Sequence, residues 1–248
     1  MSDTTSLYLA GSLAALLVGI AKGGLGLVGM LGVPIVALVT SPVRAAAILL
    51  PVYVLSDLVG LWLYRRDFSR ENVQVLVPAA CVGIALGWAT ASRVSADGVS
   101  VLVGLIGVAF VLNTWRIRRH PPLPRAAGAV RGSFWGAILG FTSFVSHAGA
   151  PPFQIYVMPQ RLPKMTYAGT STVVFAAVNA IKLIPYAALG QLSLDNLHVA
   201  AMLAIPALAG TAIGVRLVRI VPQERYYRVV QALLLLVSAR LLLRAVGI

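Results

Sequence analysis

The sequence predicts an all-α protein that crosses a membrane many times. Of its 248 residues, 59% are hydrophobic and only 11% are charged, whereas charged residues make up about a quarter of a typical globular chain. The mean hydropathy is +0.89. Apolar runs, many of them near the roughly 20 residues that a membrane-spanning helix needs, recur from end to end. The runs cover about residues 7–21, 24–40, 45–64, 72–92, 99–115, 132–146, 149–160, 168–189, 196–215 and 226–247.

Two pairs of runs are short for a span, and each pair is broken by glycine or proline. The pair at 7–40 breaks at "AKGGLG", and the pair at 132–160 breaks at "HAGAPP". We expect each pair to enter the membrane and return to the side from which it came. Three spans then follow each broken pair.

The pattern of hydropathy and helix-breaking residues occurs twice, which predicts two repeats at 1–118 and 131–248, joined by a linker at 119–130. The segment "DFSRENVQVLVPAACVGIALG" corresponds to "QLSLDNLHVAAMLAIPALAGTAIG". Gly83 and Gly87 thereby correspond to Gly210 and Gly214, a spacing of small residues that lets helices approach closely.

The basic residues predict how the chain is oriented. With both broken pairs turning back, 14 of the 20 Lys and Arg residues face one side, which is the cytoplasmic side under the positive-inside rule. Loops 65–71, 116–131 and 216–225 are then cytoplasmic, whereas both termini and loop 190–196 are periplasmic. The two halves have opposite orientation, which is typical of secondary transporters with a substrate site near the midplane.

The net charge of +13 follows from these loops and does not indicate a nucleic-acid partner. We expect the bilayer and a small solute as partners, and leave open whether the chain forms a homo-oligomer. Three His and one Cys are too few for a metal cluster. We therefore expect no metal, no cofactor and no catalytic residue.

A lysine at the first break is the first candidate site residue. A charge at the bilayer centre costs about 2.5–3.5 kcal/mol on insertion scales, so its presence calls for a reason. Lys22 directly precedes Gly23 and Gly24, where free backbone N–H groups of the next half-helix would complete an anion site. The alternative is that the Lys22 side chain extends to the membrane surface.

Four further residues are candidates. His147, two residues before Gly149 at the second break, could bind an anion, relay a proton or cap the broken backbone. Asn179 and Lys182 are three residues apart and share a helix face, which could line an aqueous path. Asp57, the one acid expected within a span, could pair with a lysine or titrate as a coupling group. We expect substrate binding at Lys22, Gly23, Gly24, His147, Gly149, Asn179 and Lys182, and coupling at Asp57 and His147.

Two segments resemble the TauE/SafE family of sulfite exporters, also called TSUP-type permeases. They are "GIAKGGLGLVGMLGVPIVALVTSPVRAAAILLPVYVLSDLVGLW" and "GFTSFVSHAGAPPFQIYVMPQRLPKMTYAGTSTVVFAAVNAIKLIPYAALGQL", and the resemblance covers nearly the whole chain. It implies a multi-pass transporter of the bacterial plasma membrane. It also implies a small sulfur-containing anion as substrate, such as sulfite, sulfoacetate or another organosulfonate.

The residues and the resemblance together predict a secondary transporter that works by alternating access and is not an enzyme. His147 and Asp57 make proton coupling one mechanism to test. The alternatives are an anion channel, or a transporter of another small organic anion. An intramembrane enzyme is a remote alternative, because Ser146 and His147 are adjacent in sequence and so point apart.

Overall fold

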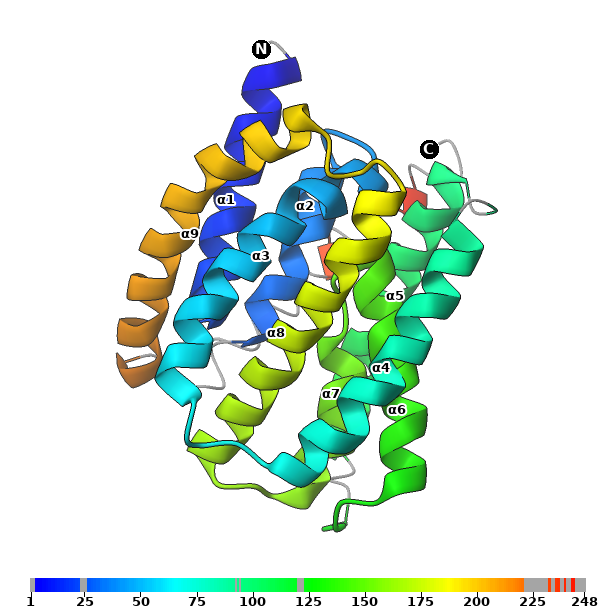
Figure 1. Ribbon diagram of the computed structural model, residues 1–248, viewed down its shortest axis with the longest axis vertical. Helices are drawn as coiled ribbons and strands as arrows, with labels where there is room; N and C mark the ends of the chain where they lie inside the picture. The colour runs from blue at the N-terminus through cyan, green and yellow to red at the C-terminus, as the bar shows by residue number, and fades with distance from the viewer. Residues whose placement is uncertain are drawn as a thin grey trace.

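The computed structural model describes residues 3–22, 26–91, 93, 95–119, 123–220 and the single positions 232, 235, 236, 239, 242 and 243. Over this part of the chain every regular element is a helix (Figure 1). In order, the elements are α1 (Asp3–Lys22), η1 (Gly26–Leu31), α2 (Gly32–Ala37), α3 (Pro42–Tyr64), α4 (Arg70–Ala91), α5 (Ala96–Arg119), α6 (Ala129–Ser146), α7 (Ala150–Val157), η2 (Met158–Gln160), α8 (Lys164–Ala188) and α9 (Leu194–Ile220).

Six of these helices, α1, α3, α4, α5, α8 and α9, are long and apolar enough to cross a membrane. The prediction of an all-α, multi-pass membrane protein is therefore confirmed. The last expected span, 226–247, lies outside the described residues except for the six single positions.

Both broken pairs turn back as expected. The start of α1 and the end of α2 lie at one end of the molecule, where Thr4 and Thr40 line the same cavity. The start of α6 and the end of η2 lie together at the other end, because the Arg125 backbone N–H donates to the Pro159 carbonyl at 3.0 Å. Figure 1 shows these as the upper and lower ends of the helix bundle.

Local sequence explains why the second pair breaks where it does. The helix α6 ends at Ser146, because the following residue, His147, takes the left-handed conformation with φ of 54°. Prolines 151 and 152 then occupy the first turn of α7, where their missing N–H groups leave no helical hydrogen bond unmade.

Close glycine contacts join α1 to α9. A Cβ atom at Gly19 would overlap the carbonyl oxygen of Ala207 on α9, and one at Gly210 would overlap the carbonyl oxygen of Leu16 on α1. Only glycine permits backbones to approach this closely.

Glycine residues permit the same close backbone contact between α4 and α6. A Cβ at Gly83 would overlap the carbonyl oxygen of Ala137, and one at Gly140 would overlap that of Ala80. Gly83 is the residue that corresponds to Gly210 in the sequence alignment. The two helix pairs therefore use equivalent positions, with the roles of the two halves exchanged.

The basic side chains are unevenly divided between the two ends of the bundle. Among the described residues, Arg44 lies in the first turn of α3 and Arg93 follows the end of α4. The α3–α4 connection and the start of α6 lie at the lower end in Figure 1. Arg65, Arg66 and Arg70 belong to that connection, and Arg116, Arg125, Arg131 and Arg161 line one cavity beside the start of α6. This division agrees with the alternation of loops that the sequence predicts.

Candidate functional site

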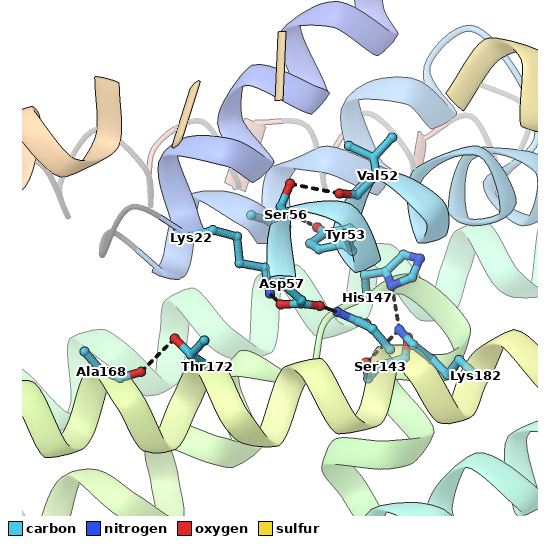
Figure 2. Close-up of polar contacts among 12 residues, drawn as sticks. Lys22, Val52, Tyr53, Ser56, Asp57, Ser143, His147, Ala168, Thr172 and Lys182 are labelled. Atoms are coloured by element: carbon cyan, nitrogen blue, oxygen red, sulfur yellow. Dashed lines mark hydrogen bonds and ion pairs between the residues drawn. The ribbon is translucent and has the colours of Figure 1, made fainter. Parts of the chain in front are cut away.

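A buried ion pair joins the first break to the middle of α3. Lys22, the last residue of α1, reaches Asp57, whose Oδ1 pairs with the Lys22 Nζ (Figure 2). The other carboxylate oxygen, Oδ2, accepts a hydrogen bond from the side-chain amide of Asn179 on α8 at 2.6 Å. The two charged side chains are only 11% and 4% exposed. Asp57 thus connects α1, α3 and α8 with both of its oxygens, and Lys22 does not extend to the membrane surface.

Aromatic rings surround the Lys22 ammonium on its other sides. Its Nζ lies 5.6 Å from the centre of the Tyr53 ring and 6.0 Å from that of Phe175. Both distances are within the range of cation–π attraction, which helps to stabilise a charge away from water.

A second cluster forms around Lys182, which is fully buried. Its Nζ donates to the backbone oxygen and to the Oγ of Ser143, both at 3.0 Å, and contacts His147 Nδ1 at 2.6 Å (Figure 2). On the far side of the ring, His147 Nε2 lies 3.0 Å from the carbonyl oxygen of Ala46. Because a carbonyl can only accept, the hydrogen-bond network assigns the proton to Nε2 and the lone pair to Nδ1.

The core has more basic than acidic groups. Within the described residues, Lys22–Asp57 is the one ion pair, so no carboxylate lies within 4.0 Å of Lys182 there. Hydrogen bonds to Ser143 and His147 satisfy the Lys182 donors but supply no negative charge. A proton on Lys182 would be a buried charge with no carboxylate in contact, which is destabilising, so an anion nearby would favour the protonated form.

The backbone at the second break holds His147 between two tyrosines. The imidazole stacks on the Tyr53 ring, with centroids 4.7 Å apart and planes at 28°. On another side, Tyr186 lies with its ring centroid 6.3 Å away, and its hydroxyl donates to the Phe144 carbonyl at 2.6 Å. The left-handed backbone at His147 is uncommon for a residue other than glycine, and these contacts hold the ring in one position.

A cavity of about 120 Å³ lies beside both clusters. It is larger than the roughly 10–15 Å³ that one water needs. It extends from His147 to Tyr64 and Tyr167, near the lower ends of α3 and α8. Its polar lining includes Lys22, Tyr53, Ser143, His147, Gln154, Ser171, Thr172 and Asn179.

Three of the predicted site residues, Lys22, His147 and Asn179, line this cavity. Asp57 and Lys182 are not among its lining residues, but each contacts residues that are. Asp57 pairs with Lys22 and accepts from Asn179, and Lys182 contacts His147 and Ser143.

The three predicted glycines have different outcomes. Gly149 precedes α7 and packs against Phe175 and Ser143, while its neighbour Ala150 lines the cavity. Gly23 and Gly24 lie outside the described residues.

Sequence reasoning missed Ser143 and Tyr53 as site residues. Each lies four positions before a residue that it identified, Ser143 before His147 and Tyr53 before Asp57. Residues four apart share one helix face, so the helical spacing was a signal for both. Thr172 also lines the cavity, and its hydroxyl donates to the Ala168 carbonyl.

Comparison with known proteins adds a family to this geometry. The family model described as sulfite exporter TauE/SafE matches residues 11–241, which include both clusters and the cavity. Searches of curated proteins and of solved structures found no match. Because the family model covers nearly the whole chain, the protein belongs to the TauE/SafE family of sulfite exporters.

Proposed function

We propose that this protein is a secondary transporter of small sulfur-containing anions, such as sulfite or organosulfonates, and that it works by alternating access. The observation that carries the proposal is a pair of buried basic side chains, Lys22 and Lys182, which have a single carboxylate beside them among the described residues and lie next to a cavity at the helix breaks. Membership of a family of membrane transporters supports it.

The cavity lining has the chemistry that an oxyanion requires. The Lys22 ammonium and the Asn179 amide can donate to sulfite or sulfonate oxygens, and the hydroxyls of Ser171 and Thr172 extend the polar surface. Hydrogen bonds from charged donors to such oxygens are among the strongest in proteins. The rings of Tyr53 and Phe175 offer an apolar wall to the carbon chain of an organosulfonate.

Asp57 competes with the substrate for Lys22, and this competition offers a means of coupling. While Asp57 is ionised, it holds the Lys22 ammonium in the ion pair. A proton on Asp57 removes that attraction and leaves the ammonium to the anion. We therefore assign Asp57 as a coupling group, so that anion binding and proton binding favour each other.

His147 is the second proposed coupling group, and it also closes the cavity. Its Nδ1 accepts from Lys182, so a proton there would place two cations in contact and separate them. Its other nitrogen contacts Ala46, which lines a separate cavity of about 90 Å³ together with Phe144 and Tyr186. One imidazole and its neighbours thus lie between two cavities, as a gate in an alternating-access transporter would.

Charge and repeat support the proposed orientation in the bacterial plasma membrane. We propose repeats at 1–118 and 131–248 around a cytoplasmic linker, with both termini in the periplasm. The arginines at the lower end support this assignment under the positive-inside rule. In this orientation the central cavity extends toward the cytoplasm.

Counterflow in vesicles tests the proposal. Purified protein is reconstituted into vesicles loaded with unlabelled sulfite, and labelled sulfite is added outside at low concentration. A carrier produces transient accumulation of label, whereas a channel equilibrates it without overshoot. Sulfoacetate inside should support the same overshoot if organosulfonates are substrates. The proposal would be contradicted if neither anion supported saturable exchange. Accumulation of labelled sulfite in vesicles that contain no unlabelled anion would contradict exchange through one site.

A further inference from the structure

Four arginines converge on a second cavity at the lower end of the molecule. This cavity has a volume of about 520 Å³, and its lining includes Arg116 from the end of α5, Arg125 from the connection before α6, Arg131 from the start of α6 and Arg161 after η2. The four residues span 46 positions of the chain, so the fold rather than a local run of charge brings them together.

Backbone hydrogen bonds hold two of these arginines in place. The Arg125 N–H donates to the Pro159 carbonyl at 3.0 Å, and the Arg161 N–H donates to the Met158 carbonyl at 3.1 Å. The hydroxyl of Tyr156 accepts from the Gly128 N–H at 3.2 Å, which fastens the same connection to α7. The cavity is therefore built on a connection fixed to the broken helix pair.

The cavity is cationic, and the described residues supply no compensating charge. Its described lining contains no Asp or Glu, and in that part of the chain none of the four arginines has a carboxylate within 4.0 Å. The positive-inside rule explains arginines at this end but not their convergence. Arg66 and Arg70 follow the same rule and lie outside this cavity.

Arginine favours a particular class of ligand. Its planar guanidinium presents paired N–H donors that match the oxygens of phosphate, sulfonate and related groups, and it stays charged at any physiological pH. The lining also includes Ile155 and Met158, and Gln154 lines both this cavity and the central one. A group with an oxyanion head fits such a lining, whether it is a free anion or is attached to a lipid.

We propose that Arg116, Arg125, Arg131 and Arg161 form a second oxyanion site, separate from the site at Lys22, that binds a phosphate or sulfonate group at the cytoplasmic end of the protein. The group comes either from a soluble anion or from the headgroup of an anionic phospholipid. The site stands on its own residues and does not require that the central cavity carries substrate.

Thermal unfolding of the purified full-length protein in neutral detergent tests the site. The protein is titrated separately with inorganic phosphate and with short-chain phosphatidylglycerol, since a ligand of the folded state raises the melting temperature. The double variant Arg125→Gln/Arg161→Gln removes two charges from the cavity. Arg66→Gln/Arg70→Gln removes two charges from the same end but outside the cavity.

We expect the cavity variant to weaken binding of at least one ligand by about tenfold or more, because charge-assisted hydrogen bonds are lost, and the control variant to change it less than twofold. Loss confined to phosphate identifies a soluble anion, and loss confined to phosphatidylglycerol identifies a lipid headgroup. Lys22→Met should retain the response.

Three results would overturn the second site. The first is an equal loss of affinity in the two double variants, which would indicate only general attraction to a basic surface. The second is a thermal response that Lys22→Met abolishes. The third is the absence of a saturable response to either ligand in the unsubstituted protein. Melting temperatures without ligand show whether each variant is folded. Counterflow of sulfite is measured in parallel. It shows whether the transport proposal holds, independently of whether the second site binds a ligand.

Discussion

Lys22 and Asp57 form a buried ion pair although 35 positions of sequence separate them. The pair closes the gap between the end of α1 and the middle of α3, and Asn179 adds α8 to it. The same three side chains therefore hold helices together and present an ammonium to the cavity. Experiments on this site must separate stability from binding.

Lys22→Met should lower both stability and anion affinity. Removing one partner leaves the Asp57 carboxylate buried and unpaired, which costs about 3–5 kcal/mol in comparable pairs. Affinity for sulfite should fall roughly tenfold to a hundredfold, because a hydrogen bond to a charged group is lost. Melting temperature and sulfite affinity are measured on the same preparation.

The double variant Lys22→Met/Asp57→Asn distinguishes these two effects. It removes the unpaired charge, so its melting temperature should recover most of the loss while its affinity stays low. If the double variant is no more stable than Lys22→Met, the ion pair does not account for the destabilisation.

Lys182→Met should weaken anion binding although Lys182 lies behind the cavity lining. The ammonium acts through a low-dielectric interior, where charge is felt over several ångströms, and we expect a loss of about tenfold. The loss should not add to that of Lys22→Met, because both charges act on one anion. Tyr186→Phe is the control, since it removes a buried hydrogen bond to Phe144 and no charge. Equal affinities for Lys182→Met and the unsubstituted protein would remove Lys182 from the binding site.

His147→Gln should flatten the dependence of transport on pH in the acidic range, where a proton on the imidazole would meet the Lys182 ammonium. Glutamine offers an acceptor for Lys182 and a donor for the Ala46 carbonyl, but it does not titrate. Initial rates of sulfite uptake into vesicles are measured across this range. His198→Gln, which changes an exposed histidine, should keep the full dependence. An unchanged profile for His147→Gln would leave His147 with a structural role alone.

Helix ends were predictable from sequence because local chemistry determines them. The glycines after Lys22 and the prolines after His147 mark breaks, and α1 and α6 end at Lys22 and Ser146. Pairing of Asp57 with a lysine was one of two sequence-based expectations, and the structure has that pair. Which lysine pairs with it was not predictable, since no local pattern specifies which helices become neighbours. A lysine that only completed an anion site could be replaced by methionine without loss of stability, whereas the ion pair with Asp57 makes Lys22→Met destabilising.

The sequence also did not predict which side of α8 faces the cavity. Asn179 and Lys182 share one helix face, and the spacing suggested that both would line the same path. In the structure Asn179 faces the cavity, whereas Lys182 reaches Ser143 and His147 behind it. That difference depends on how α8 packs against α3 and α6, which spacing within one helix does not encode.

Gly19→Ala and Gly140→Ala should destabilise the protein to a similar extent. Each adds a methyl group where backbone from the facing helix lies, and such overpacking costs about 1–3 kcal/mol. Gly128→Ala is the control, because nothing lies within 4 Å of a Cβ there. Thermal unfolding in detergent compares the three. If Gly19→Ala and Gly140→Ala melted at the same temperature as Gly128→Ala, the facing helices would accommodate the added methyl group without loss of stability.

Labelling of single cysteines tests the orientation. In a Cys81→Ala background, which removes the only cysteine, Leu194→Cys should react with an impermeant thiol reagent in intact cells. Arg66→Cys and Arg125→Cys should react only after the membrane is permeabilised. All three side chains are exposed in the structure. Labelling of Arg125→Cys from outside would invert the proposed topology.

The exchanged glycine contacts make the interface between the two halves isologous, the kind of surface that two copies of one subunit share in a symmetric dimer. The contacts at Gly19, Gly83, Gly140 and Gly210 lie within helices on either side of the proposed linker at 119–130, not in the linker itself. The connection therefore acts by raising the effective concentration of one half near the other. A chain cut within this linker removes none of the residues that make these contacts, so its two pieces, made together in one membrane, retain the surfaces that assemble the transporter.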